Sequence, residues 1–311
     1  EKNFMNENKK RMRMKIRDNF ELFVFTLPAI ISLAIFHYWP LAGNIMAFKD
    51  YKYAKGIFGS DWNGLKNFEY FFTSQDAVRI TRNTILYNGA FIVVGIACAV
   101  IVALLLYQIT TRGAIKLYQT MMILPRFLSW VIVSYIVYIL LNPTSGVLNG
   151  ILNAVGKSGV QWYGTTKPWP YILIFSNLWK HVGLDSIIYY SALLGIDEEQ
   201  FEAAEVDGAS KFVQMVRIAV PSILPVIVIM FILQIGSIFG GDFGLFYQIP
   251  RNIGTLYPVT DVIPTYVFRG LQGGDYATST AVGLFQSAVG FALVIITNII
   301  VKKIDPDKAI F

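Results

Sequence analysis

The sequence predicts an all-α membrane protein with six transmembrane helices, and three observations support this class. Of the 311 residues, 55% are hydrophobic and only 15% are charged, so the chain has too little polar surface for an ordinary soluble domain. Its mean hydropathy of +0.52 indicates the same. Six apolar runs reach the length of roughly 20 residues that a bilayer core requires. A basic segment precedes the first of them.

The predicted spans follow one another along most of the chain. They cover 22–48, 83–108, 115–141, 168–194, 221–241 and 277–301. A basic N-terminus (1–21) precedes this transmembrane domain (22–301), and a short tail (302–311) follows it. Four polar residues interrupt the fourth span: Asn177, Lys180, His181 and Asp185. We expect their side chains to face protein or water instead of lipid.

The distribution of basic residues predicts the side of the membrane that each loop occupies. Seven of the 26 Lys and Arg lie before the first span, within the basic N-terminus. Such a cluster is typical of a cytoplasmic flank beside anionic lipid, which we prefer to a nucleic-acid-binding arm. With this end inside, Lys and Arg are about twice as dense in the inside segments as in the outside ones. A multi-pass protein of the cell membrane, with both termini and residues 195–220 in the cytoplasm, is therefore predicted.

Residues 197–221 form a polar segment between the fourth and fifth spans. Asp197 is placed to cap a first short helix, and Gly208 to end it in the left-handed conformation that glycine tolerates. Ser210 is placed to cap a second helix, and Pro221 to open the fifth span. The pattern predicts two short helices around a break, which together form a docking surface.

Six residues of this segment stand at the spacings of a known motif. They are Glu202, Ala203, Ala204, Gly208, Ile218 and Pro221, with gaps of three, nine and two residues after Ala204, Gly208 and Ile218. The arrangement resembles the EAA motif of the permease subunits of binding-protein-dependent ABC importers. Val220 is the departure, because this family commonly has Leu there.

The resemblance implies the fold of a type I ABC importer permease, in which the motif forms a coupling helix that docks on a separate ATPase. It assigns this contact to Glu202, Ala203, Ala204, Asp207, Gly208, Ile218 and Pro221. It further implies two copies of a cytoplasmic ATPase, which bind the ATP and Mg, a second and different permease subunit, and an extracellular substrate-binding protein. The chain itself then carries neither a catalytic site nor a cofactor.

Shorter matches resemble the carbohydrate-uptake branch of this family, and most of all its polysaccharide and oligosaccharide permeases. They lie at 62–68, 82–84, 124–125, 179–196 and 281–287. The resemblance implies import of a sugar, with an oligosaccharide as the expected cargo.

Side chains suited to contact a sugar are aromatic or carry amides, and eight of them within or beside the spans are substrate-path candidates. They are Trp130, Tyr135, Tyr138, Asn142, Asn177, Tyr189, Gln234 and Gln286. A structural role is the alternative for each, because aromatic residues gather at membrane interfaces and buried amides hydrogen-bond between helices.

Other functional classes have weaker support. The Gly-Lys-Ser run at 156–158 resembles the end of a phosphate-binding loop, but its spacing to the preceding glycine is wrong and no predicted strand leads into it. Neither histidine belongs to a recognisable metal-binding pattern, so no metal is expected. An ion-coupled secondary transporter or channel subunit remains the alternative, although the inner spans hold few ionisable groups beyond Lys180 and Asp185.

Overall fold

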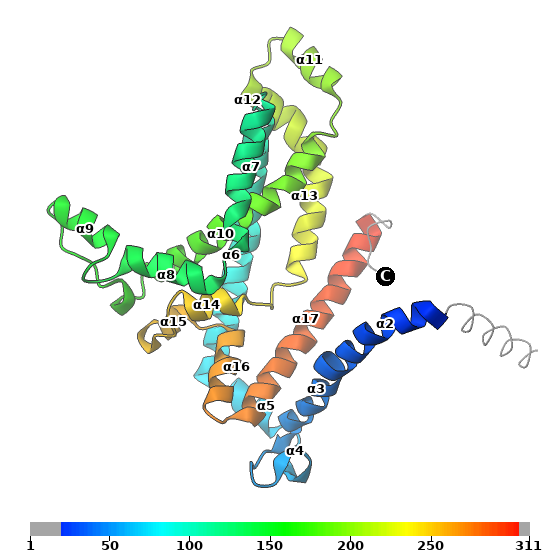
Figure 1. Cartoon of the computed structure of the whole chain (residues 1–311), viewed down its shortest axis with the longest axis vertical. Helices are drawn as coiled ribbons and strands as arrows, with labels where there is room; N and C mark the ends of the chain where they lie inside the picture. Colours follow the sequence, from blue (N-terminus) through cyan, green and yellow to red (C-terminus); the bar gives the residue numbers. More distant parts are fainter. Residues whose placement is uncertain (1–19, 305–311) are drawn as a thin grey trace, which may run out of the picture.

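The computed structural model describes residues 20–304 and shows an almost entirely helical chain (Figure 1). Most of the predicted cytoplasmic segments 1–21 and 302–311 lies outside these residues. Within the described part, strands are limited to β1 (Lys49–Asp50) and β2 (Asp61–Trp62), which pair antiparallel with Lys49 opposite Trp62. The predicted all-α class is confirmed.

The first predicted span is a continuous helical stretch that changes geometry twice. It comprises α2 (Phe20–Leu33), the π-helical turn η1 (Ala34–Tyr38), α3 (Trp39–Leu41) and the 3-10 turn η2 (Ala42–Phe48). Pro40 cannot donate a backbone hydrogen bond, and the wider π turn lies directly before it. The stretch Val24–Phe48 is apolar enough to cross a membrane, yet its most apolar part has no buried residue. In Figure 1 α2 diverges from the other helices, whereas η2 at the end of the stretch packs against α17.

A 33-residue helix, α6 (Gln75–Tyr107), runs through most of the molecule and is about 50 Å long. Two short helices, α4 (Gly56–Gly59) and α5 (Lys66–Thr73), precede it. Ser74 caps α6, because its Oγ accepts a hydrogen bond from the Ala77 N–H at 3.2 Å. The helix therefore starts before the predicted span at 83, and its additional polar turns pack on α5 and α16.

The third predicted span is two helices instead of one. α7 (Arg112–Phe127) and α8 (Trp130–Leu141) meet at an angle of 99°. Pro125 lies in the last turn of α7, and the Ser129 Oγ caps α8 by accepting a backbone hydrogen bond at 3.3 Å. These two residues make a break more favourable than a continuous helix, so the uninterrupted span 115–141 is corrected to a broken one.

The fourth predicted span corresponds to α10 (Trp169–Leu193), which follows α9 (Val147–Ala154) and the 3-10 turn η3 (Trp162–Gly164). Gly183 lets α10 approach α7 closely, because a Cβ there would overlap the Met122 carbonyl. Among the described residues, four helices are long and apolar enough to span a membrane, or five if the bent pair counts as one. α10 is not among them, because polar residues interrupt it. The count of six spans stays a prediction.

The fifth predicted span begins earlier than Pro221. One helix runs from Lys211 to Ile235 through α12 (Lys211–Gln214), the π turn η4 (Met215–Ala219) and α13 (Val220–Ile235). Pro221 lies inside this helix instead of opening a new one, which corrects the prediction. Proline has no N–H to donate to the preceding turn. The π turn before Pro221 has a wider hydrogen-bond spacing, which lets the helix continue past the proline.

The remaining helices bring the chain back against α6. They are α14 (Phe243–Gln248), the 3-10 turn η5 (Gly254–Leu256), α15 (Tyr257–Thr260), α16 (Ile263–Gln272) and α17 (Tyr276–Ile304). The last of these contains the predicted span 277–301. A buried carboxylate, Asp261, joins this region to α6, because its Oδ2 lies 3.2 Å from Arg79 and 2.6 Å from Arg269.

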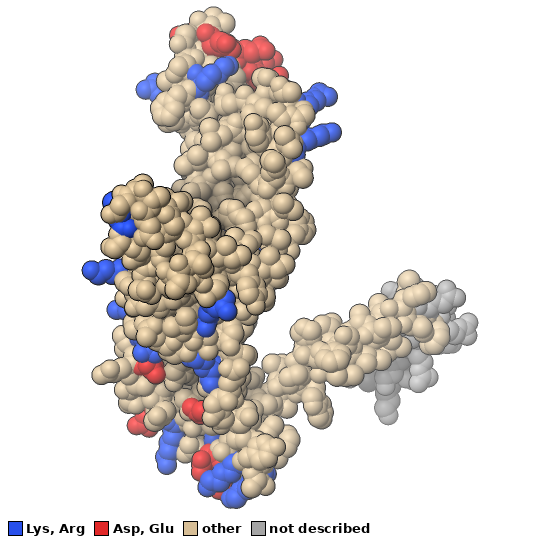
Figure 2. Space-filling view, turned by 60° about the vertical axis from the view of Figure 1, so that its left-hand side comes forward, with Lys and Arg blue, Asp and Glu red and all other residues tan. Residues whose placement is uncertain are grey.

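Three clusters of buried apolar side chains form the core, and each includes a part of α6. One contains Tyr87 and joins α6 to α8, α10 and α14; another contains Ile96 and joins it to α10 and α13. The third contains Ile80 and joins it to α5, α16 and α17. In the face shown in Figure 2, acidic side chains gather toward the two ends, and the surface between them is uncharged apart from scattered Lys and Arg side chains. This distribution suits a chain whose middle lies in a membrane.

Candidate functional site

The polar segment, residues 197–221, forms one tip of the molecule (Figure 1). It begins with α11 (Glu198–Val206), which Asp197 caps by accepting a hydrogen bond from a backbone N–H at 3.1 Å. Gly208, with φ +77, ends it. The N–H groups of Gly208 and of the next residue donate to carbonyls in the last turn of α11, at 3.0 and 2.9 Å. This is the Schellman arrangement, so both the predicted cap and the predicted terminator are confirmed.

The second helix of the segment starts where the sequence predicts. The Ser210 Oγ accepts a hydrogen bond from the Val213 N–H at 3.4 Å, which caps α12. The Gln214 amide reaches back to the Ala209 carbonyl at 3.1 Å. The connection between the two helices is therefore short and internally hydrogen-bonded.

The predicted contact residues lie mostly on the surface of this tip. Glu202, Ala203, Asp207, Gly208 and Pro221 are exposed, and Ala204 and Ile218 are half-buried. Phe201 instead faces the body of the protein, with its ring centroid 5.7 Å from that of Tyr107 at the end of α6. This aromatic contact thus anchors α11, while Glu202 stays exposed and Glu205 pairs with Lys211 at 3.5 Å.

Two exposed apolar side chains accompany the carboxylates. Val206 is 89% exposed and Phe212 is 70% exposed. Sequence reasoning missed them, because the spacing of Phe212 in the second helix is also that of a core-facing stripe. Apolar side chains beside charged ones suit a protein partner better than water.

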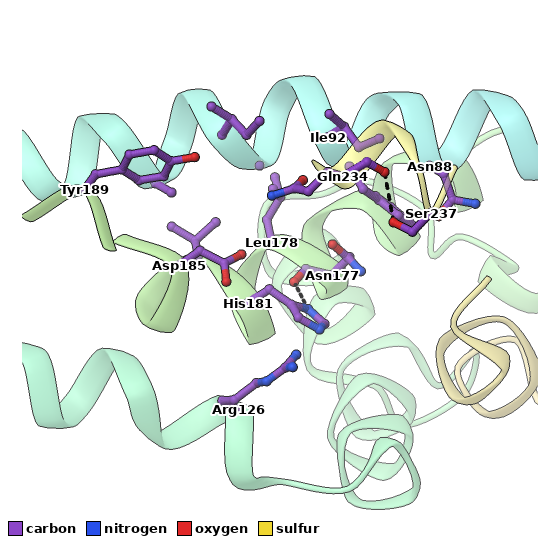
Figure 3. Close-up of a pocket in the computed structure, with 15 residues that line it drawn as sticks. Asn88, Ile92, Arg126, Asn177, Leu178, His181, Asp185, Tyr189, Gln234 and Ser237 are labelled. Atoms are coloured by element: carbon purple, nitrogen blue, oxygen red, sulfur yellow. Dashed lines mark hydrogen bonds between the residues drawn. The ribbon is translucent and has the colours of Figure 1, made fainter. Parts of the chain in front are cut away.

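A central pocket of about 420 Å³ lies between α6, α7, α10 and α13 (Figure 3). Its lining consists of Asn88, Phe91, Ile92, Gly95, Ile96, Ala99, Arg126, Asn177, Leu178, His181, Val182, Asp185, Tyr189, Gln234 and Ser237. The pocket thus combines apolar walls with amides, hydroxyls and charged groups that converge from separate helices. This is the composition of a site for a polar ligand.

Three predicted path residues meet in the central pocket. Asn177 and Tyr189 come from α10, and Gln234 comes from the end of α13 (Figure 3). The Tyr189 side chain is almost fully buried, and its hydroxyl has no hydrogen-bond partner in the described structure. A buried hydroxyl without a partner is costly, so a ligand or water that enters the pocket would gain a favourable bond there.

Charged side chains of the central pocket were not among the predicted path residues. Arg126, from the end of α7, faces His181 and Asp185 on α10 across the pocket (Figure 3). Nδ1 of His181 lies 2.9 Å from the Asn177 carbonyl oxygen, which fixes the ring. The sequence did signal that His181 and Asp185 avoid lipid. It gave no such signal for Arg126, because that residue is brought to the pocket by the break after α7.

Lys180 is the fourth polar residue of α10, and it faces protein as expected. Its ammonium group is buried and donates hydrogen bonds to the carbonyls of Arg126, at 3.2 Å, and Leu128. These carbonyls lack partners within α7 because the helix ends there. Lys180 therefore stabilises the break between α7 and α8.

Trp130 joins this break to the start of α14. Its Nε1 donates a hydrogen bond to Oδ2 of Asp242 at 2.6 Å, and Oδ1 of Asp242 caps α14 through the Leu245 N–H at 3.3 Å. Gly244 leaves room for the indole, because a Cβ there would overlap it. The Trp130 ring centroid lies 6.1 Å from that of His181. Trp130 thus borders the central pocket without lining it.

Besides Trp130, four predicted path residues lie outside the central pocket. Tyr135 lines a smaller pocket, the α8–α14 pocket, and Tyr138 packs edge-on against Tyr163 at 5.6 Å. Asn142 holds the turn after α8, because its Oδ1 accepts hydrogen bonds from residues 144 and 145. The Gln286 amide donates to the Phe239 carbonyl at 3.0 Å. The last two side chains have structural roles in this conformation.

Tyr163, in the loop before α10, illustrates the electrostatics beside this second pocket. Burial raises the pKa of Tyr163 to about 12, and the positive charge of Arg251 only partly opposes this effect. The phenol is therefore neutral at physiological pH. Within residues 20–304, no three His, Cys, Asp or Glu side chains are arranged to hold a metal ion.

Comparison with known proteins bears on the role of these features. A match to the family described as "Binding-protein-dependent transport system inner membrane component" covers residues 92–309. The chain belongs to this family. It is therefore a membrane-embedded transport subunit. The polar segment and all of the central pocket except Asn88 and Phe91 fall within the matched region.

Relatives of this permease are known by sequence and by structure. It is 33% identical to the polygalacturonan/rhamnogalacturonan transport system permease protein YteP of Bacillus subtilis (strain 168), over 96% of this chain and 93% of the relative. It is 32% identical to protein LplB of the same organism, over 92% and 90%. A chain of a bacterial ABC transporter involved in the import of the acidic polysaccharide alginate is 33% identical, with a TM-score of 0.83 over 95% and 99% of the two chains. A chain of a bacterial alginate ABC transporter in complex with an alginate pentasaccharide-bound periplasmic protein is also 33% identical, with a TM-score of 0.81 over 94% and 98% of the two chains.

Proposed function

We propose that this permease forms one half of the transmembrane path of an ATP-driven importer for an oligosaccharide. The observation that carries the proposal is the continuous helix Lys211–Ile235. It starts in the exposed polar segment and ends beside Gln234 and Ser237 in the central pocket. A movement imposed on the polar segment is thereby transmitted to the pocket through one rigid element.

A separate cytoplasmic ATPase, in two copies that bind ATP and Mg, is the partner that we assign to the polar segment. Glu202 and Asp207 offer carboxylates to a basic cleft, while Ala203 and Ala204 permit close approach. Gly208 sets the angle between the two helices through its left-handed backbone. Ile218 and Pro221 connect the docking surface to α13. Val206 and Phe212 add apolar contact area.

An oligosaccharide is the cargo that best suits the central pocket. Amide groups of Asn177 and Gln234 and the free Tyr189 hydroxyl match the many hydroxyl groups of a sugar. The relatives named for polygalacturonan, rhamnogalacturonan and alginate transport support the same class. The pocket is only half of the path in this proposal. A second, different permease subunit closes it, and an extracellular binding protein delivers the sugar.

The orientation follows from the same proposal. The basic segment 1–21, the polar segment and the tail 302–311 face the cytoplasm, and the domain 22–301 crosses the membrane six times if α10 is counted as a span. The polar residues of α10 do not contradict this, because they face the pocket or the carbonyls of α7 and not lipid.

Substitution of Glu202 tests the proposal directly. The complete transporter, reconstituted in vesicles with ATP, is compared with the Glu202→Ala variant and with Glu69→Ala, a matched change of an exposed glutamate at the other end of the molecule. We expect Glu202→Ala to reduce ATPase binding and uptake at least about tenfold, because removing a charged hydrogen-bond partner costs about 1.5–3 kcal/mol. Glu69→Ala should change neither. Full transport by Glu202→Ala, or uptake driven by a proton gradient without ATP, would contradict the proposal.

A further inference from the structure

A second polar pocket lies between α8 and the end of α14, next to Trp130 in sequence. This α8–α14 pocket has a volume of about 230 Å³ and is lined by Val131, Ser134, Tyr135, Tyr247, Gln248, Arg251 and Asn252. Trp130 contacts the His181 side of the central pocket, and the next residue of α8 already lines the second one. The two polar pockets are therefore neighbours at the start of α8, where Trp130 contacts the lining of one and Val131 lines the other.

Arg251 occupies a backbone position at which glycine is usual. Its N–H donates to the Gln248 carbonyl at 3.1 Å, and the Asn252 N–H donates to the Tyr247 carbonyl at 3.2 Å. These two bonds form a Schellman cap after α14, in which Arg251, with φ 57°, and the following Asn252, with φ 51°, are both left-handed. A Cβ disfavours the left-handed conformation, so an arginine at this position raises the conformational free energy of the folded backbone relative to glycine. Such cost is typical of residues whose side chains are used.

The guanidinium of Arg251 is held in place but not neutralised. Its central carbon lies 4.3 Å from the ring centroid of Tyr138 and 5.7 Å from that of Tyr135. Among residues 20–304, no carboxylate lies within ion-pair distance of it and no protein oxygen accepts a hydrogen bond from it. Stacking thus fixes the plane of the guanidinium and leaves its N–H groups available to an anion.

The remaining lining supplies an aromatic face and an amide. Tyr247 is stacked on Phe243 with ring centroids 4.9 Å apart, which fixes its orientation. Oδ1 of Asn252 accepts a hydrogen bond from the Tyr257 hydroxyl at 3.0 Å, so the Asn252 NH₂ group remains a donor. Aromatic faces, an amide donor and a fixed arginine together suit a sugar ring that bears a carboxylate.

A lipid is a less suitable ligand for the α8–α14 pocket. The opposite face of α8 carries an apolar groove of about 500 Å³, lined by side chains such as Leu140 and Phe175. An acyl chain would gain more from that groove than from a pocket with tyrosine, amide and guanidinium groups.

We propose that the α8–α14 pocket is a second saccharide subsite, selective for an acidic sugar residue whose carboxylate binds Arg251. This rests on the proposed function and specifies its cargo as an oligosaccharide that contains uronic acid. The pocket takes one ring of the chain, and the rest passes Trp130 toward the central pocket. There Arg126 also lines the cavity, and no carboxylate within residues 20–304 forms an ion pair with it.

Equilibrium binding to the purified complete transporter tests the subsite. The probes are trisaccharides of galacturonate and of mannuronate, each paired with a counterpart whose carboxyl groups have been reduced to hydroxymethyl groups. For at least one pair, the wild type should bind the acidic trisaccharide about tenfold more tightly or better, as expected for a hydrogen bond to a charged group. Arg251→Gln should lose this preference, Arg251→Lys should keep part of it, and Arg112→Gln, an exposed arginine at the far end of α7, should keep all of it.

A glycine variant separates ligand binding from a structural role. Arg251→Gly relieves the left-handed strain, so its melting temperature should equal or exceed that of the wild type while the preference for acidic sugars disappears. The proposal is overturned if the wild type has no preference, if Arg251→Gln keeps it, if neither trisaccharide binds, or if Arg251→Gly melts well below the wild type. It is also overturned if Arg251→Gln changes only the amount of co-purified anionic phospholipid. The subsite and the proposed function can fail separately. If ATP-driven uptake of neutral oligosaccharides does not depend on Arg251, the proposed function stands even when the binding experiments contradict the subsite.

Discussion

At the scale of single residues, Asp261 shows how one buried charge joins distant parts of the chain. Its side chain has no exposed surface, and Oδ2 is shared by Arg79, from α6, and Arg269, from α16. Oδ1 accepts a hydrogen bond from the Thr265 hydroxyl at 2.8 Å. A carboxylate without these partners would be costly to bury. The network therefore fixes the α15–α16 corner against α6.

Asp261→Asn tests this network. The amide keeps the shape but loses the negative charge, so Arg269 loses its carboxylate partner and Arg79 keeps only Asp76, at 2.8 Å. We expect a loss of about 1.5–3 kcal/mol in stability, as for hydrogen bonds to charged groups. The measurement is the melting temperature of the purified complex in detergent. Asp50→Asn is the control, since the ion pair of Asp50 with Lys52 at 3.2 Å is exposed and should contribute little. Equal melting temperatures for the two variants would refute the role of Asp261.

At the scale of elements, the helix Lys211–Ile235 and the broken pair α7–α8 have opposite mechanical properties. The first is continuous across a π turn and two prolines, so it moves as one body. The second is bent by 99° and is held by Lys180 and by the hydrogen bond between Trp130 and Asp242. The central pocket lies between them, with residues from both. One side of the central pocket is therefore the continuous helix Lys211–Ile235, which can move as a unit, and the other side is the rigid bend between α7 and α8.

Two glycines inserted between Val220 and Pro221 test whether this helix moves as a unit. The insertion weakens the helix there and shifts any helix that remains by about 200° relative to the polar segment. ATPase binding should persist because residues 197–214 are unchanged, whereas ATP-driven uptake should fall by roughly tenfold or more, the range of a lost allosteric coupling. Both are measured on the reconstituted transporter. The same insertion between Gly273 and Gly274, in the exposed turn before α17, serves as the control. Normal uptake with the first insertion would show that α13 does not transmit the movement.

At the scale of the whole molecule, the tip formed by the polar segment (197–221) and the β1–β2 hairpin lie at opposite ends of the long axis (Figure 1). α6 connects these ends, and the central pocket opens beside its middle, at Asn88 and Ile92. The proposed orientation puts the tip in the cytoplasm and the hairpin outside. A cargo that enters from the hairpin side meets the pocket before it reaches the tip.

Single cysteines test this orientation. Cys98 is the only cysteine of the sequence, so Cys98→Ser gives a background in which Val206→Cys marks the tip and Phe58→Cys marks the hairpin end. Both positions are highly exposed, which permits labelling by a membrane-impermeant maleimide. We expect Val206→Cys to react only in inside-out vesicles that lack the ATPase, and Phe58→Cys only in right-side-out vesicles. The reverse pattern, or labelling of both from one side, would invert or exclude the predicted topology.

The sequence by itself determined the features that depend on neighbouring residues. The apolar runs predicted the helices, and the caps at Asp197 and Ser210 and the left-handed Gly208 are found as predicted. Fixed spacings within the polar segment pointed to the permease family. Each of these features depends on hydrogen bonds or periodicity within a few residues. A short stretch of sequence is therefore enough to predict it.

Only the tertiary structure decided which of the candidate side chains meet. Asn177, Tyr189 and Gln234 share a pocket, whereas Asn142 and Gln286 are engaged in turns and helix contacts. Arg126 and Arg251 were not candidates at all. The first reaches a pocket because α7 breaks after Pro125, and the second because it follows α14 with a left-handed backbone. These placements depend on helices that are distant in sequence and on a bend that exchanges helical hydrogen bonds for contacts with Lys180 and Asp242. A local sequence pattern does not predict where a helix will bend in this way, because the free energy that stabilises the bend comes from contacts with residues elsewhere in the chain.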